Sequence, residues 1–131
     1  MAYIGPVHRW DIFRADLDPV IGSEQRGPNR PVIIVSNDGV NASLKLVTVV
    51  PVTKLEDKQR KVYPFEVVLP KGAITSAYAS IVMPQQVRSI SKLRLLEKIG
   101  TLSDPAHQTE IENRLLEHLG IQFEAENLAD L

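Results

Sequence analysis

The feature that most constrains this chain is a series of short strand-like segments between residues 10 and 90, with no long helix among them. Residues 10–16 alternate large apolar with polar side chains, the period-2 pattern of a half-buried strand. The other segments are residues 31–37, 44–52, 62–70, 78–84 and 85–90. Because strands come early and helix comes late, the pattern is not the βαβ alternation of a parallel sheet. We expect a mainly β fold: a small antiparallel barrel or strongly twisted sheet, with helix at the end.

Turn-forming residues separate these segments. Residues 18–30 hold two Gly and two Pro with Asp, Ser and Asn, which predicts a loop, and ordered loops of this length are often functional. The pairs Asp38-Gly39 and Lys71-Gly72 predict tight turns. Pro51, near the end of its strand, predicts an edge or a bulge, where a missing N–H is tolerated.

Two helices are expected near the end of the chain. From Ser91 onward, Leu93, Leu96 and Ile99 recur at helical spacing and Gly100 ends the pattern. The final helix has clearer signals. Asp104 is a good N-cap, Pro105 suits the first helical position, and Gly120 closes the helix. Its apolar stripe consists of Ile111, Leu115 and Leu119, with Leu116 beside it.

Length and composition limit the class of protein. The 131 residues fit one domain, with residues 1–8 as a flexible N-terminus and residues 121–131 as an acidic C-terminal tail. The absence of cysteine excludes disulfides, thiolate zinc sites and cysteine nucleophiles. There is neither a secretory signal nor an apolar run long enough to cross a bilayer, so we expect a cytoplasmic protein with no membrane partner.

Charge is distributed unevenly along the chain. The formal net charge is −1, but residues 1–102 hold 14 Lys+Arg against 9 Asp+Glu, a balance of +5, and residues 103–131 hold 1 against 7, a balance of −6. A basic body with an acidic tail can bind phosphate locally although the whole chain is nearly neutral. The tail can equally be a solvated helix face. If it competes for a basic groove, deleting residues 121–131 should change nucleic-acid affinity at low salt.

Common catalytic signatures are missing. The histidines, His8, His107 and His118, are not spaced as metal ligands, and no metal site is expected. There is no nucleotide-binding glycine loop, serine-nucleophile elbow or zinc-protease helix. The loop GSEQRGPNRPV (22–32) is more informative, because it sets hydroxyl, amide and guanidinium groups beside glycines and could surround a phosphate. On composition alone, a solvated surface loop is the more frequent case.

Three blocks of the sequence together resemble the MazF/PemK family of toxin endoribonucleases. They are GSEQRGPNRPVIIVSND, then VTVVPVT, then SIVMPQQVRSISKLRL, in this order and at suitable spacing. The resemblance runs from about Trp10 to the last helix. It implies an SH3-like barrel with a terminal helix, assembled as a two-fold homodimer whose groove holds single-stranded RNA.

The resemblance also implies the site. The family's catalytic arginine falls on Arg30 and its catalytic threonine on Thr53. Residues lining the substrate, or near the RNA surface, fall on Ser23, Glu24, Gln25, Ser80, Gln85, Gln86 and Arg88. Arg26 lies in the same loop, and the charged segment 54–61 follows Thr53 directly, so its basic residues could guide the RNA backbone. They are Lys54, Lys58, Arg60 and Lys61.

The implied activity is metal-independent cleavage of single-stranded mRNA, which would inhibit translation. The 2′-hydroxyl attacks the phosphate and leaves a 2′,3′-cyclic phosphate and a 5′-hydroxyl, with no cofactor. The implied protein partner is an antitoxin whose acidic, flexible segment covers the groove. Two alternatives share the fold: a gyrase-poisoning toxin of the CcdB type and a non-catalytic SH3-like binding module. In those cases Arg30 could form a structural ion pair with Glu24, and Thr53 could be an ordinary residue at the end of a strand.

Two departures from the family pattern stand out. Four residues separate Gln25 from Arg30, where the family commonly has three. The usual Arg-Gly-Asp before the first strand is Arg9-Trp10-Asp11 here. The longer loop leaves the contacts of residues 23–25 open, but it hardly affects the identification of Arg30.

Overall fold

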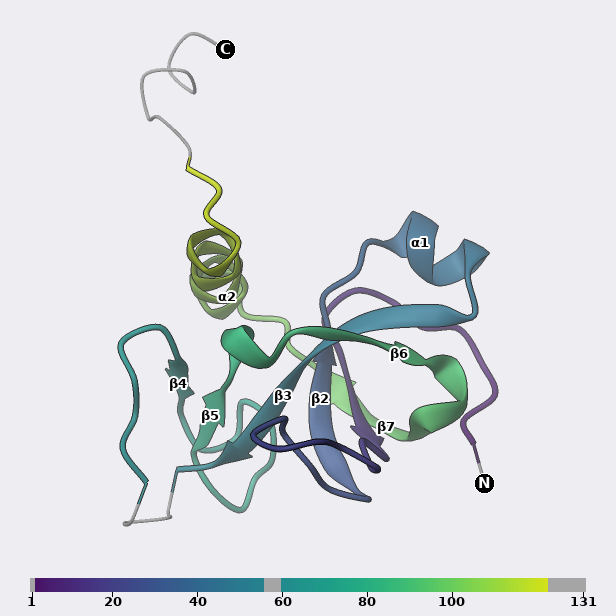
Figure 1. The fold of residues 1–131 in the computed structure, drawn as a ribbon, viewed down its shortest axis with the longest axis horizontal. Helices are drawn as coiled ribbons and strands as arrows, with labels where there is room; N and C mark the ends of the chain where they lie inside the picture. The colour runs from purple at the N-terminus through teal and green to yellow at the C-terminus, as the bar shows by residue number, and fades with distance from the viewer. Residues whose placement is uncertain (1, 56–59, 123–131) are drawn as a thin grey trace, which may run out of the picture.

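The computed structural model describes residues 2–55 and 60–122. Its strands are β1 (Asp11–Ala15), β2 (Arg30–Ile34), β3 (Leu46–Lys54), β4 (Val67–Leu69), β5 (Ser80–Val82), β6 (Arg88–Ser91) and β7 (Leu95–Thr101). Its helices are α1 (Asp38–Ser43) and α2 (Pro105–His118), with 3-10 turns η1 (Pro84–Gln86) and η2 (Lys92–Arg94). Figure 1 shows the sheet curling beneath α1 and α2. No helix in these ranges is long and apolar enough to span a membrane.

The strands form one antiparallel sheet in the order β4-β5-β3-β2-β1-β7, and β6 pairs with β3. This confirms the antiparallel fold with a C-terminal helix. The sheet is twisted but not closed, since no pairing joins its end strands β4 and β7 within the described residues. Of the two forms expected, the open twisted sheet is therefore the one observed.

The long strand β3 changes partner along its length. Its first half pairs with β6 and its end pairs with β5. Pro51 lies between these two pairings, and its carbonyl accepts a hydrogen bond from the Met83 N–H at 3.0 Å. The N and C=O of one strand residue point to the same side of the strand. The missing N–H of Pro51 therefore lies on the side where β3 changes from β6 to β5 as its partner, and a missing donor is tolerated there. Of the two positions predicted for Pro51, an edge or a bulge, the edge was wrong, since β3 lies inside the sheet.

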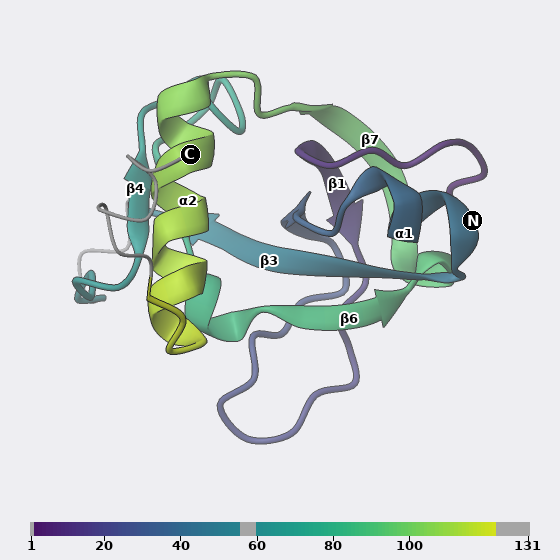
Figure 2. The ribbon, with the colours of Figure 1, turned by 90° about the horizontal axis from the view of Figure 1, so that it is seen from above.

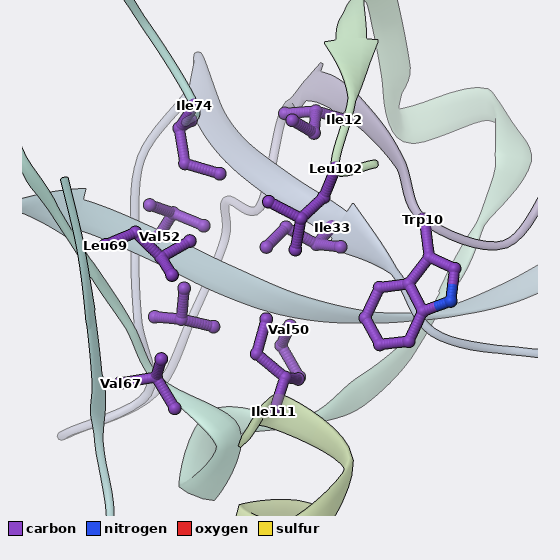
Figure 3. Packing of buried hydrophobic residues seen from close by; sticks show 11 residues of the cluster. Trp10, Ile12, Ile33, Val50, Val52, Val67, Leu69, Ile74, Leu102 and Ile111 are labelled. Atoms are coloured by element: carbon purple, nitrogen blue, oxygen red, sulfur yellow. The ribbon is translucent and has the colours of Figure 1, made fainter. Parts of the chain in front are cut away.

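Two apolar clusters hold the sheet together. One contains Phe13 and other buried residues of β1, β2, β3, β6 and β7. The other lies on the opposite side and contains Ile12 of β1 and Ile33 of β2 together with Val67 of β4 and Ile111 of α2 (Figure 3). Neighbouring side chains of β1 thus enter different clusters, as alternation along a strand requires.

The predicted C-terminal helix is confirmed at both ends. The Asp104 side chain accepts from the Ala106 N–H at 2.9 Å, Pro105 opens α2, and Gly120 follows the helix with a φ of 72°. Ile111 is fully buried, but Leu119 is 61% exposed. The buried stripe is therefore shorter than predicted.

Other segments differ from the predictions. Residues 91–100 are not a helix: they form η2 and then β7, which pairs with β1 along its length. The expected Asp38-Gly39 turn is the start of α1, capped by Asn37. Only Val67–Leu69 of the predicted strand 62–70 is in the sheet, and residues 85–86 lie in a 3-10 turn.

Trp10 occupies the position where the resembled family commonly has glycine. Its φ is +74°, a conformation that costs a non-glycine residue about 1–2 kcal/mol. The indole is 9% exposed in the second cluster, with the Arg9 guanidinium 4.7 Å from the ring centroid. Truncating a buried Trp typically costs about 3–5 kcal/mol, so burial outweighs the backbone strain.

Candidate active site

Arg30 and Thr53 meet at one end of the sheet. Arg30 is the first residue of β2, and Thr53 lies near the end of β3, the antiparallel neighbour of β2. An Arg30 Nη1–H donates to Thr53 Oγ1 at 3.2 Å, and its Nε–H donates to the Arg26 carbonyl at 3.1 Å. The two residues that the resemblance singled out, 23 positions apart in the chain, are therefore in direct contact.

The alternative role for Arg30, an ion pair with Glu24, does not form among the described residues. The Glu24 carboxylate instead accepts from the Ile21 N–H at 2.9 Å, which folds the loop tip. The Arg30 guanidinium is thus held by a carbonyl and a hydroxyl, and no carboxylate of the described residues pairs with its positive charge.

Burial changes the acidity of Arg30. Desolvation of the half-buried guanidinium lowers its pKa below the usual value for arginine, and the charges of Tyr78 and Asp18 oppose this effect. Arginine remains protonated at neutral pH even so. The site therefore holds a cation in partly dry surroundings, where its attraction for a phosphate is stronger than in water.

Arg30 and Thr53 open into a pocket of 450 Å³. Its walls are Arg14, Gly27, Pro28, Asn29, Arg30, Pro31, Val52, Thr53, Lys54 and Tyr78. This volume is in the range of pockets that hold a nucleotide-sized ligand. The ammonium group of Lys54 lies over the ring of Tyr78, 4.8 Å from its centroid.

The loop between β1 and β2 extends beyond the body of the sheet (Figure 2), and its residues 27–29 line this pocket. Gln86 of η1 holds the loop twice: its carbonyl oxygen accepts from the Gln25 N–H at 3.0 Å, and its amide nitrogen donates to the Ser23 carbonyl at 3.1 Å. Arg88 donates to the Leu17 carbonyl at 3.5 Å. Gln86 and Arg88, expected near the RNA, thus support the loop that forms the pocket rim.

Gly27 brings the longer loop close to Arg30. Its N–H donates to the Asp18 carboxylate at 3.1 Å, and its carbonyl accepts from the Leu17 N–H at 2.9 Å. Its φ is +142°, and a Cβ added here would lie 3.2 Å from Arg30 Nε. The longer connection is therefore accommodated by a glycine that packs against the guanidinium.

Not all the predicted residues lie at the pocket. Ser80 is fully buried in β5, so its side chain does not reach the surface in this conformation. Gln85 and Arg60 both donate to the Glu66 carboxylate, at 2.7 and 2.6 Å, away from the residues that line the pocket. Arg26 and Lys61 are exposed, and Lys58 lies outside the described residues.

A metal site is not formed by the described residues, among which no group of three or more His, Asp or Glu side chains could hold an ion. His8 and His107 each lie 3.8 Å from a single carboxylate, that of Asp11 and of Asp104 respectively.

Sequence reasoning missed Arg14 and Tyr78 as pocket residues. Arg14 shares a strand face with the buried Ile12, so the alternation of residues 10–16 did not mark it as a site residue. The loop that it faces depends on the pairing of β1 with β2, which no local pattern contains.

Comparison with known proteins places these features in a family. A sequence model described as PemK-like, MazF-like toxin of type II toxin–antitoxin systems matches residues 8–119. The chain is 37% identical over 120 residues to endoribonuclease MazF9 of Mycobacterium tuberculosis, covering 88% of this chain and 98% of that protein.

Solved structures share the fold. The crystal structure of MazF (form I) from Deinococcus radiodurans superposes with a TM-score of 0.75 at 25% identity, covering 90% of this chain and 100% of that chain. An endoribonuclease from a mycobacterial species, solved in complex with its cognate antitoxin, gives a TM-score of 0.70 at 21% identity, covering 92% and 100%.

Proposed function

Because this chain belongs to the PemK-like, MazF-like family of toxins of type II toxin–antitoxin systems, we propose that it is an endoribonuclease that cleaves single-stranded RNA. The observation that carries this proposal is the Arg30–Thr53 hydrogen bond inside a nucleotide-sized pocket. RNA supplies its own nucleophile, the 2′-hydroxyl, so no activated serine or cysteine is needed.

The reaction is a transesterification. The ribose 2′-oxygen attacks phosphorus as the bond to the 5′-oxygen breaks, leaving a 2′,3′-cyclic phosphate and a 5′-hydroxyl. The 2′-hydroxyl loses one proton and the leaving oxygen gains one. Negative charge builds on the phosphate oxygens in the transition state, and preorganised donors aimed at that charge supply most of the catalysis.

Arg30 and Thr53 can divide this work. The Arg30 guanidinium presents further N–H donors beyond those bound to Arg26 and Thr53. Since Thr53 Oγ1 accepts from Arg30, its own hydroxyl proton is directed elsewhere and is available to a phosphate oxygen. The lowered pKa of Arg30 favours proton transfer compared with an exposed arginine, but charge stabilisation remains its main role.

The surroundings suit a single strand. The pocket is bordered by the exposed loop residues Pro28 and Asn29, and splayed nucleotides leave the 2′-hydroxyl free to align. Lys54 directly follows Thr53 and lines the pocket, while Arg26 lies in the loop before Arg30 and Lys61 is exposed in the segment before β4. They are candidates for binding the RNA backbone.

The relatives support a biological setting for this activity. MazF of Deinococcus radiodurans has been solved with MazE, and a mycobacterial endoribonuclease with its cognate antitoxin, and we extend this to an acidic, flexible antitoxin that covers the pocket of this chain. We further propose a homodimer that acts on mRNA in the cytoplasm, inhibits translation and needs no metal.

Incubation of the purified protein with unstructured RNA in EDTA tests the activity. Wild type should yield 2′,3′-cyclic phosphate ends, and Arg30→Ala should reduce the cleavage rate by about 100-fold or more. Thr53→Val, which keeps the β-branched shape, should reduce it by about 10-fold. Arg114→Ala is the matched control, because Arg114 lies on α2 in an ion pair with Glu117.

Intact RNA in the wild-type reaction, or equal rates for wild type and Arg30→Ala, would overturn the proposal. Toxicity that survives Arg30→Ala would instead indicate a gyrase-poisoning toxin. Harmless expression of the wild type would indicate a binding module.

A further inference from the structure

Among the residues that the structure describes, three cations and no carboxylate line the pocket. Arg14, Arg30 and Lys54 come from β1, β2 and β3, while the remaining lining residues are neutral. One phosphodiester carries a single negative charge, and at most one more builds on it in the transition state. Three cations therefore exceed the charge of the cleaved phosphate alone.

Arg14 is held at the pocket wall by a single weak bond within the described part of the chain. Its Nη1–H donates to the Asn29 carbonyl at 3.4 Å, and Asn29 directly precedes Arg30. Glu97 of β7 lies opposite Arg14 in the sheet register, but no ion pair joins them among the described residues. A guanidinium has five N–H donors, so most of those on Arg14 remain available to a ligand.

Lys54 follows Thr53 on β3. Successive strand side chains point to opposite faces, so the lysine would ordinarily turn away from the threonine. Here the ammonium lies over the ring of Tyr78, which also lines the pocket. This cation–π interaction holds the charge at the wall without neutralising it.

We propose that Arg14 and Lys54 bind a second phosphate of the RNA, adjacent to the one that is cleaved, and that Tyr78 positions Lys54 to do so. The proposal rests on the proposed ribonuclease function and adds a subsite to it. Holding the neighbouring phosphate fixes the ribose between the two, and such positioning aligns the 2′-oxygen for attack. The pocket then binds two consecutive phosphates of the RNA.

Binding to a non-cleavable oligonucleotide, with 2′-deoxyribose at the attacking position, measures the subsite directly. If the side chain binds a phosphate, Arg14→Gln or Lys54→Gln should each make the slope of log Kd against log salt concentration shallower by about 0.7. Arg14→Lys, which keeps the charge, should retain the slope. Lys45→Gln is the matched control, because Lys45 precedes the opposite end of β3, about 30 Å away.

A substrate change checks the same interaction from the RNA side. Replacing the phosphate on either side of the cleaved one by a neutral methylphosphonate should reduce kcat/KM of the wild type by about 10-fold at one of the two positions. The double variant Arg14→Gln/Lys54→Gln should show no such effect. Tyr78→Phe, which keeps the ring under Lys54, should retain the methylphosphonate effect, and Tyr78→Leu, which removes the ring, should weaken it.

The outcomes separate the two proposals. If the wild type cleaves RNA but folded variants keep the full salt slope and the methylphosphonate effect, the subsite is wrong and the ribonuclease stands. If the wild type binds RNA with the expected slopes but never cleaves it, Arg14 and Lys54 do bind RNA phosphate, but the ribonuclease function, and with it their role in cleavage, is wrong. Circular dichroism of each variant shows whether it is folded.

Discussion

Gly27 lies directly against the Arg30 side chain. A methyl group here would lie 3.2 Å from Nε and 3.3 Å from Cβ of Arg30, at a φ of +142° that L-residues rarely adopt. We therefore expect Gly27→Ala to shift the guanidinium away from Thr53. Because small displacements of catalytic groups are costly, kcat on RNA should fall by about 10- to 100-fold.

The control is a glycine with the same kind of backbone conformation but open space beside it. Gly72 has a φ of +96°, lies in the turn after β4, and a Cβ added to it would meet no described atom within 4 Å. Gly72→Ala should lower stability and leave kcat unchanged, as urea unfolding and single-turnover cleavage would show. Equal losses of activity in both variants would mean that general strain, and not the position of Arg30, limits the reaction.

Individual site residues were predictable to different degrees. Arg30 and Thr53 were predicted as a pair because their blocks have a recognisable order and spacing, and the structure brings the two side chains into contact. Ser80 was predicted near the RNA but is fully buried, because all of Ser80–Val82 in β5 is covered on both faces. Burial on both faces removes the alternation that would have distinguished inward from outward residues.

Local sequence signals predicted a helix or strand correctly only where pairing with a distant segment did not determine the structure. α2 carries its own cap, its Pro at the first position and its apolar stripe, so its limits follow from nearby residues. Leu93, Leu96 and Ile99 have helical spacing, yet Leu95 is the fully buried residue and Leu93 is 79% exposed. The pairing of β7 with β1, far earlier in the chain, determines which of these residues are buried. The residues near β7 in the sequence carry no information about that pairing.

Glu66 connects the segment before β4 to η1, where Gln85 precedes the loop-holding Gln86. Desolvation alone would raise the pKa of this buried carboxyl. Hydrogen bonds from Arg60, the Tyr63 N–H and Gln85, together with the charge of Arg60, outweigh desolvation and lower the pKa below 4.5. A lowered folded-state pKa means that the carboxylate stabilises the fold above pH 4.5 and loses this effect as pH falls through its folded value.

We therefore expect Glu66→Gln to be less stable than the wild type at pH 7, with a difference that shrinks steadily below about pH 4.5. Urea unfolding at about pH 7, 5, 4 and 3 measures this. Glu110→Gln, which changes an exposed carboxylate on α2, is the control and should follow the wild type. A difference for Glu66→Gln that is the same at every pH would exclude the charged hydrogen-bond network as its cause.

At the scale of the whole molecule, the net charge of −1 results from a basic pocket and an acidic end whose charges nearly cancel with the rest of the chain. Removing residues 123–131 deletes Glu124, Glu126 and Asp130 and changes the formal net charge from −1 to +2. The truncation keeps Ile121, whose N–H donates to the Leu116 carbonyl at 2.8 Å, so α2 retains its last bond. Any change in RNA binding then reflects charge and not the loss of the helix.

The truncated chain should associate with RNA several-fold faster than the full chain at about 10 mM salt, where charges act over about 30 Å. The two rates should converge at about 1 M salt, where that distance falls to about 3 Å. Full-length protein carrying Glu124→Gln, Glu126→Gln and Asp130→Asn keeps the length and should match the truncation, because the effect depends on charge alone. Stopped-flow fluorescence with labelled RNA gives the rates. If neither rate nor affinity changes at low salt, the acidic end does not compete for the pocket, and the cations of the pocket act without opposition from their own chain.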